Sequence, residues 1–396
     1  MIETNRQMFM RFVAQTSYTP LNIEVEKAQG VYLYGPNGEK YLDTVSGISV
    51  ANVGHCHPKV VEAVKNQVDK YMHLTVYGEF IQCPQVLLAK KMVELLPENL
   101  NSVFFVNSGS EATDGSIKLA KRYTHRPEVV AFKGAYHGST IGAMSVWGDE
   151  YFKSAYRPLM PGVKMLRFNN FEDLQQITDN TACVLTEPIQ SEGGLNLPEN
   201  GWLTKLRERC NETGTLLIFD EVQMGWGRTG KMFGFENFNV VPDIVNFAKG
   251  LGGGMPIGAF VANKKIMEAF CDNPILGHIT TFGGHPVSAA AALANINVIL
   301  DENLVESAND KGDYFEFLMK KHSKVLRTWG LGLFRGVEVD HNIDMFKFLH
   351  QSLNHGIFTD LFIFRQNAFR FAPPLIINKS QIEEAVEKIS ATLDEL

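Results

Sequence analysis

The sequence predicts an α/β fold, with a mainly parallel sheet covered by helices in a large domain and a smaller α+β lobe. Short apolar runs alternate with helical patterns through the middle of the chain. These runs are apolar at nearly every position, as in strands buried on both faces. No repeat, charge block or low-complexity tract interrupts them. The expected strands are residues 102–106, 129–132, 182–186, 215–219, 244–247 and 258–262.

The N-terminal region contains a predicted hairpin and a predicted helix. Residues 31–34 and 40–42 flank Gly35-Pro36-Asn37-Gly38, a turn sequence that predicts a β-hairpin. Pro58 then begins a helix, because proline suits the first helical position. The apolar positions of this helix follow helical spacing: Val61, Val64, Val68 and Met72.

The remaining elements define the domain organisation. Amphipathic patterns at residues 110–123 and 201–213 predict helices between the strands. After about residue 300 the pattern changes to a helix at 310–321, two strands and a closing helix at 380–396. We therefore expect an N-terminal segment (1–50) that joins the small lobe, a large domain (51–300) and a C-terminal small domain (301–396).

Composition excludes several classes of protein. The chain has 396 residues, 45% of them hydrophobic, and a formal net charge of −7. So much apolar surface argues against disorder, and the acidic balance argues against nucleic acid or an anionic membrane as a partner. The most apolar stretch, residues 289–300, is too short to span a bilayer. The odd, scattered cysteines predict reduced thiols and a cytoplasmic location: Cys56, Cys83, Cys183, Cys210 and Cys271.

Chemistry-bearing residues follow several of the predicted strands. The run ending at Val106 leads into Asn107-Ser108-Gly109-Ser110-Glu111-Ala112, where small residues begin a helix. The free N–H groups at such a helix start bind anions, usually phosphate, although an ordinary helix cap is the alternative. The run ending at Phe219 leads into Asp220-Glu221-Val222-Gln223. These carboxylates suit a metal, a base, the partner of a cationic ring nitrogen, or merely a solvated loop.

Lys249 follows the run ending at Phe247 and precedes a loop with four glycines in residues 250–254. A nucleotide-binding P-loop has the opposite order, with its lysine after the glycines. A half-buried lysine with a lowered pKa readily forms a Schiff base, whereas a lysine beside a flexible loop can also be simply solvated.

Tyr136-His137 lies between glycines after another predicted strand, and suits stacking on a planar ring as well as a structural role. His55-Cys56-His57 does not predict a metal site, because adjacent side chains diverge and no carboxylate partner is nearby in the sequence. A phosphate site, a stacking aromatic, a carboxylate and a reactive lysine together match pyridoxal 5′-phosphate (PLP).

These motifs resemble those of the class III aminotransferases, the PLP fold type I enzymes that include ornithine, acetylornithine, 4-aminobutyrate and diaminopelargonate aminotransferases. The resemblance extends over nearly the whole chain. Its motifs are residues 30–43, 54–58, 108–112, 136–138, 187–194, 220–230, 249–254, 280–286 and 370–375.

The resemblance implies a role for each matching residue around the cofactor. Lys249 resembles the lysine that binds PLP covalently, and Asp220 resembles the carboxylate that pairs with the pyridine nitrogen. Val222 and Tyr136 resemble the residues on the two faces of the ring. Gln223 resembles the side chain near the ring hydroxyl.

The resemblance also implies a phosphate site that two subunits share. Gly109 and Ser110 match the phosphate-binding residues of one subunit, and Thr281 matches a threonine that reaches the phosphate from the neighbouring subunit. A homodimer with shared active sites follows from this match. The predicted cofactor-binding set is completed by Ser108, His137 and Glu187.

Arg370 resembles the family arginine that binds the α-carboxylate, and Glu192 resembles the acidic residue that masks it. At one position the sequence departs from many relatives: Ser139 stands where ornithine, acetylornithine and 4-aminobutyrate enzymes have an arginine for the distal carboxylate of the substrate. The sequence Tyr136-His137-Gly138-Ser139 is closer to the diaminopelargonate and ω-amine branches. Residues 187–194, in contrast, resemble the ornithine branch.

We therefore predict an aminotransferase that moves an amino group from a terminal (ω) amine to a 2-oxo acid, such as 2-oxoglutarate, by a ping-pong mechanism. The alternatives are a PLP-dependent aminomutase or racemase on the same scaffold, or a diaminopelargonate-type transaminase. An aminotransferase needs a second substrate for repeated turnover, whereas an isomerase does not. The presence of both Lys249 and Asp220 argues against a protein that only binds its ligand.

Overall fold

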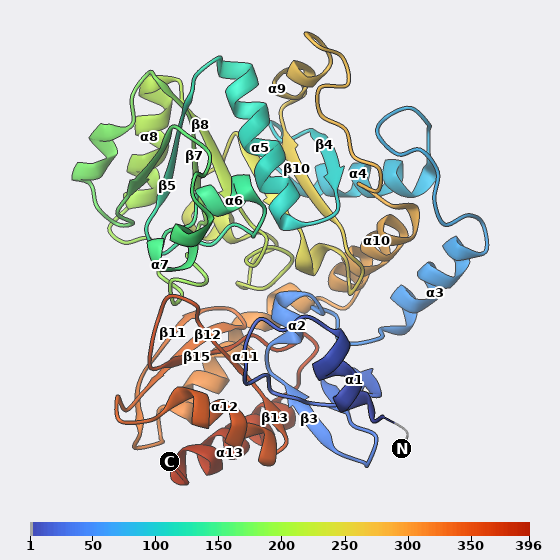
Figure 1. Ribbon diagram of the computed structural model, residues 1–396, viewed down its shortest axis with the longest axis vertical. Coiled ribbons are helices and arrows are strands. Elements are labelled where there is room, and N and C mark those ends of the chain that lie inside the picture. The colour runs from blue at the N-terminus through green and yellow to red at the C-terminus, as the bar shows by residue number, and fades with distance from the viewer. Residues whose placement is uncertain (1–2) are drawn as a thin grey trace.

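The computed structural model describes residues 3–396 and contains a central seven-stranded sheet with the order β4-β10-β9-β8-β7-β5-β6 (Figure 1). Strands β9, β8, β7, β5 and β6 are parallel, whereas β10 is antiparallel to both of its neighbours, β9 and β4. The predicted mainly parallel sheet is confirmed. The strands are β4 (Ser102–Val106), β5 (Glu128–Phe132), β6 (Val163–Leu166), β7 (Thr181–Thr186), β8 (Leu216–Asp220), β9 (Ile244–Phe247) and β10 (Gly258–Ala262).

The strand predictions for this sheet needed two corrections. Strand β6 was not predicted, because its short sequence includes Lys164 and only Leu166 is fully buried at the edge of the sheet. Strand β8 begins at Leu216 and ends at Asp220, so that this carboxylate belongs to the strand itself. Its main chain is thereby held by the sheet rather than by a loop.

Helices cover the central sheet, and α5 (Gly109–Thr124) shows why its sequence forms one. The Ser108 hydroxyl accepts a hydrogen bond from the Glu111 amide at its start, and His125 ends it in a left-handed conformation. One face of α5 is buried against the sheet through residues such as Ile117 and Leu119. The other helices in this half are α3 (Pro58–Val68), α4 (Cys83–Leu95), α6 (Ile141–Ser145), α7 (Glu150–Lys153), α8 (Trp202–Thr213), α9 (Lys264–Met267) and α10 (Pro286–Asp301).

Two smaller sheets form the other half of the molecule. The hairpin prediction is confirmed by β2 (Tyr32–Tyr34) and β3 (Lys40–Asp43). They lie in a sheet with the order β1-β2-β3-β13, in which β3 pairs with β13 near the C-terminus. This sheet joins the two ends of the chain, while the predicted division into three segments stays a prediction. The remaining strands are β1 (Lys27–Gln29), β11 (Val325–Leu331), β12 (Phe334–Val339), β13 (Ile357–Phe358), β14 (Asp360–Leu361) and β15 (Ala368–Phe371).

The prediction of one helix, two strands and a closing helix after residue 300 was too simple. The first helix begins at Leu304, six residues before the predicted start. Helix α12 and strands β13, β14 and β15 follow the two predicted strands. Strands of two residues carry no periodicity that could reveal them. The other helices are α1 (Asn5–Phe12), α2 (Ser46–Ser49), α11 (Leu304–Met319), α12 (Met345–Asn354), α13 (Lys379–Asp394) and the 3₁₀ turns η1 (Ser154–Tyr156), η2 (Glu172–Gln176), η3 (Gly234–Phe238), η4 (Lys249–Leu251) and η5 (Glu268–Phe270).

The region around α3 differs from its prediction in two ways. The helix ends at Val68, before Met72, and both of these side chains are exposed in the single chain. The fold brings carboxylates to the two histidines that are not near them in the sequence: His55 pairs with Asp43 (2.7 Å) and His57 pairs with Glu302 (3.3 Å). Among residues 3–396, no group of three or more His, Cys, Asp and Glu residues could hold a metal ion.

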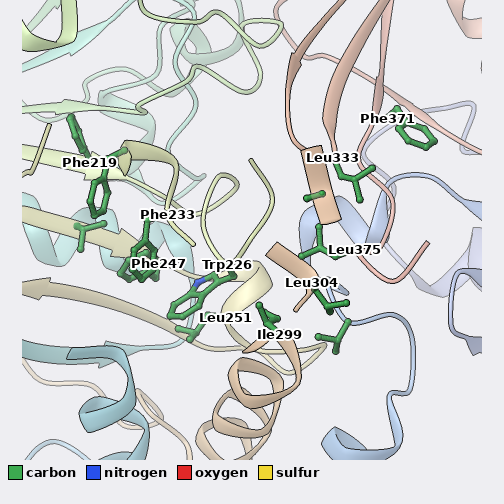
Figure 2. Close-up of a cluster of buried hydrophobic side chains, with 14 of the residues drawn as sticks. Phe219, Trp226, Phe233, Phe247, Leu251, Ile299, Leu304, Leu333, Phe371 and Leu375 are labelled. Carbon is green, nitrogen blue, oxygen red and sulfur yellow. The ribbon is translucent and has the colours of Figure 1, made fainter. Parts of the chain in front are cut away.

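One hydrophobic core extends between the central sheet and the smaller sheets (Figure 2). Phe219 and Phe247 from the central strands lie on one side, and Trp226 leads from them toward Leu333 and Leu375. Because this core is continuous, the loops after the central strands are held between two packed bodies rather than in solvent. No helix in the described part of the chain is long and apolar enough to cross a membrane.

Candidate active site

A cavity of about 410 Å³ lies where the central strands end. The carboxyl ends of parallel strands meet at one edge of the sheet, so clusters far apart in the sequence converge there. All of the predicted cofactor-binding residues except Thr281 line this cavity. Those residues are Ser108, Gly109, Ser110, Tyr136, His137, Glu187, Asp220, Val222, Gln223 and Lys249.

One end of the cavity is formed by the start of α5. The amide of Ser139 donates a hydrogen bond to Ser110 Oγ (2.9 Å), which leaves the Ser110 hydroxyl hydrogen free to donate. Gly138 has a φ of 115° and lies so close to Ser110 that any Cβ at this position would collide with it. The first N–H groups of a helix lack partners within the helix, so this end of the cavity suits an anion.

Asp220 is fixed by two hydrogen bonds on the floor of the cavity. Its Oδ2 lies 2.7 Å from His137 Nδ1, and its Oδ1 accepts a hydrogen bond from the Val222 amide (3.0 Å). Sequence reasoning assigned His137 to the site but did not foresee this contact with Asp220. The carboxylate is 4% exposed and therefore has a fixed direction.

Several buried polar atoms around the cavity have no hydrogen-bond partner. Glu187 accepts hydrogen bonds from the Ser191 amide and hydroxyl on Oε1, but its Oε2 has no partner. His137 Nε2 and Gln223 Oε1 are also buried and have no hydrogen-bond partner. Burial, together with the nearby Asp220 charge, raises the pKa of Glu187 to about 7. Polar atoms of this kind, around a cavity, indicate a site that takes a polar ligand.

Lys249 lines the cavity two residues after the end of β9. Its backbone has a φ of 44°, a left-handed conformation that costs free energy for a residue other than glycine. Burial lowers the pKa of Lys249, and the Arg370 charge lowers it further, although the Glu192 charge acts in the opposite direction. Asn295 donates hydrogen bonds to the carbonyls of Gly250 and Leu251 and so holds the loop that follows. The main chain beside Lys249 is therefore held in place, and the amine loses its proton more readily than an exposed lysine does.

Glu192 and Arg370 form a bidentate ion pair just beyond this lining. Arg370 Nη1 and Nη2 donate to the two carboxylate oxygens at 2.8 and 2.7 Å, and both side chains are at most 4% exposed. Gln223 Nε2 also donates to Glu192 Oε1 (2.9 Å), which connects the pair to the cavity. Burial by itself raises the pKa of Glu192, yet the Arg370 charge and hydrogen bonds lower it to about 2.

Aromatic side chains gather beside Tyr136 at the outer end of the site. The Tyr136 and Trp147 rings are 4.7 Å apart, and Phe364 packs near both Trp147 and Phe152. The hydroxyl of Ser139 lies 3.3 Å from that of Tyr136. Among the described residues that line the cavity, Lys249 alone is a lysine or arginine. Sequence reasoning missed Trp147, Phe152 and Phe364, because isolated aromatic residues in unpatterned segments do not reveal their neighbours.

These features fit the cofactor predicted from the sequence. PLP needs an anion site, contacts on both ring faces, a partner for the ring nitrogen and an amine. The cavity offers the start of α5, Tyr136 with Val222, Asp220 and Lys249. A Cβ on Gly109 would lie 3.1 Å from the Val222 methyl groups, so the absence of a side chain at this position leaves Val222 its place.

Comparisons with known proteins agree with this geometry. Residues 13–393 match the family model described as "Aminotransferase class-III". The acetylornithine aminotransferase of Methanocaldococcus jannaschii is 38% identical over 96% of this chain and 95% of its own. The ornithine aminotransferase of Macrococcus caseolyticus is 37% identical over 94% of each chain.

Solved structures show the same similarity. A transaminase from a marine Virgibacillus has a TM-score of 0.91 at 30% identity and covers 98% of this chain and 97% of its own. The ornithine aminotransferase of Toxoplasma gondii also has a TM-score of 0.91, at 28% identity, and covers 100% of this chain and 96% of its own. A further structure of the Toxoplasma enzyme has PLP at partial occupancy in its active site.

Proposed function

The chain belongs to the class III aminotransferase family. We propose that it transfers the terminal amine of a donor to a 2-oxo acid such as 2-oxoglutarate, and that no arginine binds the far end of this donor. Family membership confirms the predicted family, the enzyme class, the PLP cofactor and the activity of an ω-aminotransferase. The relatives named above are aminotransferases and give no support to an aminomutase or a racemase. The donor, the residue roles and the assembly are the proposal.

Each cavity residue has a role in this proposal. The bound cofactor supplies an aldehyde that reacts with amines and a cationic ring that accepts electrons from the adjoining carbon. Asp220, fixed by His137, holds a proton at the ring nitrogen. Lys249 would hold the cofactor through its amine and, when this amine is free, would accept and return a proton at Nζ. Its lowered pKa supports this role, because a neutral amine is both nucleophile and base.

The other lining residues orient the cofactor. Tyr136 and Val222 contact the ring faces, and Gln223 contacts the ring hydroxyl. The start of α5 holds the phosphate through Ser110 and main-chain N–H groups. Glu187 and Ser108 also line the cavity: Glu187 offers an unpaired buried oxygen to the ligand, and the Ser108 hydroxyl caps α5.

The bidentate Glu192–Arg370 pair is the observation that supports an ω-amine donor. While the pair is closed, the Arg370 guanidinium is neutralised, so it does not attract an α-carboxylate to the ring. An amine without an adjacent carboxylate meets no such requirement. When the 2-oxo acid binds, Glu192 turns away and Arg370 binds its carboxylate through two parallel hydrogen bonds.

The far end of the donor lies toward Ser139 and the aromatic side chains. A serine there provides no bidentate contact for a distal carboxylate. The acetylornithine and ornithine aminotransferases among the relatives identify the donor class as amines at the end of a carbon chain. We propose a far end without a carboxylate, packed against Tyr136 and Trp147.

We also propose a homodimer and a cytoplasmic location. Exposed apolar side chains gather in residues 68–87 and 275–282, and His73 packs on Phe282 at 4.8 Å, which places these two segments side by side. An apolar surface of this kind is typical of an obligate interface. Thr281 is exposed there, outside its own chain's cavity, as a residue that serves the partner's phosphate would be.

The proposed cytoplasmic location is supported by the cysteines. All five are free, as is usual in a reducing compartment.

A panel of donors tests this function. Holoenzyme is mixed with ornithine, acetylornithine, 4-aminobutyrate, lysine or putrescine without any oxo acid, and the cofactor absorbance is followed for one turnover. We expect donors with a terminal amine and no distal carboxylate to convert the cofactor to its aminated form fastest. Repeated turnover without an oxo acid would refute an aminotransferase, and a strong preference for acetylornithine would refute the proposed far end.

A further inference from the structure

Arg370 faces a second carboxylate, that of Asp360. Asp360 Oδ2 lies 3.6 Å from Arg370 Nε, on the side away from the Glu192 pair. The contact is set by the sheet, because Asp360 in β14 is the register partner of Arg370 in β15. About a third of the Asp360 side chain is exposed, at 35%, whereas Arg370 is almost completely buried. Asp360 is therefore the solvent-facing member of a cluster of three charges.

The segment that begins at Asp360 surrounds the guanidinium. Arg370 Nη2 donates to the Leu361 carbonyl, and the guanidinium lies 5.1 Å from the centre of the Phe362 ring. Nε is buried and has no hydrogen-bond partner, because Asp360 lies just beyond hydrogen-bond distance. An unpaired buried N–H with a carboxylate in front of it is an unmet contact that a small movement of either side chain completes.

Net charge in this cluster decides which groups it accepts. Two carboxylates, those of Glu192 and Asp360, face the single charge of Arg370. When Glu192 turns away, Arg370 is still partly neutralised by Asp360. A substrate carboxylate then approaches a nearly neutral pair rather than a free cation, and its attraction is weaker.

We propose that Asp360 is a specificity-determining positioning residue, which weakens the binding of 2-oxo acid carboxylates at Arg370 and leaves the binding of ω-amine donors unchanged. This inference rests on the proposed function, in which Arg370 binds the carboxylate of the oxo acid. Asp360 acts through Arg370: when Glu192 leaves, Asp360 takes up Nε and so keeps part of the guanidinium charge compensated. Burial raises the pKa of Asp360, while the Arg370 charge acts in the opposite direction.

Binding of glutarate, a dicarboxylate without an oxo group, tests the inference without turnover. Calorimetric titration of the holoenzyme should show a dissociation constant about tenfold lower in Asp360→Asn than in wild type, equivalent to about 1.4 kcal/mol. Asp360→Ser should behave in the same way, and Asp360→Glu, which restores the charge, should bind as wild type does. In single turnovers of the Asp360→Asn enzyme, the half-saturating concentration of 2-oxoglutarate should fall, while the ω-amine half-reaction keeps its rate and its half-saturating concentration.

Two further variants separate the possible outcomes. Asp310→Asn removes the same charge from an exposed position on α11, and should leave glutarate binding unchanged. Arg370→Gln should abolish the tight binding of glutarate. If it does, but Asp360→Asn binds glutarate as wild type or more weakly, the inference about Asp360 is overturned and the proposed function stands. If Arg370→Gln binds glutarate as well as wild type does, the proposed carboxylate site itself fails.

Discussion

Replacing Glu192 by alanine should change which half-reaction the enzyme favours. The substitution removes the bidentate partner of Arg370 and leaves a buried guanidinium with weaker compensation from the Leu361 carbonyl and Asp360. An unpaired buried charge is costly, so a carboxylate beside the reacting carbon becomes favourable there. We expect the rate constant of the half-reaction with glutamate to rise and that of the half-reaction with an ω-amine to stay unchanged.

The size of the effect follows from the pair itself. The pKa of Glu192 lies at about 2, against an ordinary value of 4.5. A difference of this size corresponds to about 3 kcal/mol of interaction with the charged carboxylate. Asp360 and the Leu361 carbonyl keep part of the compensation after Glu192 is removed, so we expect a little under half of it to appear. The ratio of glutamate to ω-amine rate constants should therefore rise by about tenfold, or about 1.4 kcal/mol.

Stopped-flow absorbance of the cofactor measures both half-reactions separately in wild type and variants. Arg370→Ala should do the opposite of Glu192→Ala: it should impair the oxo-acid half-reaction and spare the ω-amine one. Glu338→Ala is the matched control, since that carboxylate pairs with Arg327 and Arg365 instead. An unchanged ratio in Glu192→Ala would mean that the pair only supports the structure, and the argument for an ω-amine donor would fail with it.

Further predictions concern the amine, the carboxylate, the core and pH. Borohydride reduction and peptide mapping should place the cofactor on Lys249 and on no other lysine, and Lys249→Ala should lose nearly all turnover. Asp220→Asn should slow proton abstraction in single turnovers far more than it weakens donor binding, because an amide cannot keep the ring nitrogen protonated. Arg228 is fully buried and donates hydrogen bonds to four oxygen atoms. In urea titrations, Arg228→Met should lower the free energy of unfolding by about 3 kcal/mol or more, whereas Arg327→Met, at an exposed position, should lower it by less than about 1 kcal/mol. Because the pKa of Glu192 is lowered on folding, the ion pair stabilises the folded state fully above about pH 5, and this stabilisation is lost as the pH falls toward 2. Between pH 5.5 and 3.5 the free energy of unfolding of the wild type should therefore fall by about 1.4 kcal/mol more than that of Glu192→Gln in the same titrations. Equal losses in the two proteins would contradict the ionic character of the pair.

The part of the site that comes from strand ends could be predicted from the sequence. Asp220 and Lys249 each follow an apolar run, and parallel strands bring such positions to one edge of a sheet. The start of α5 was visible for the same reason, because Ser108 and the glycine after it are typical of a helix N-terminus that faces a ligand. At these positions the local sequence is enough to predict where the residue lies in the fold.

The remainder depends on pairings that the sequence does not encode locally. Glu192 and Arg370 are 178 residues apart, and only the resemblance to a family suggested that they meet. Asp360 lies in a strand of two residues without periodicity, so neither its strand nor its contact with Arg370 could be foreseen. The same is true of the apolar residues around Met72 and Phe282, whose exposure could not be foreseen from the sequence.

The way Glu192 is attached determines what has to move during the reaction. Its carbonyl accepts a hydrogen bond from the Phe364 amide (3.0 Å) in the loop between β14 and β15, and Trp329 of β11 donates to the carbonyl of Gly194 (2.9 Å), so the main chain here is tied to the smaller half of the molecule. The side chain, in contrast, is held by Arg370, Gln223 and the Ile363 amide, all of which release it by rotation of one side chain. Arg370 is itself fixed within β15. In the proposed function, exchange between donor and oxo acid therefore requires Glu192 to rotate about its own bonds, while the two packed halves of the molecule keep their contact.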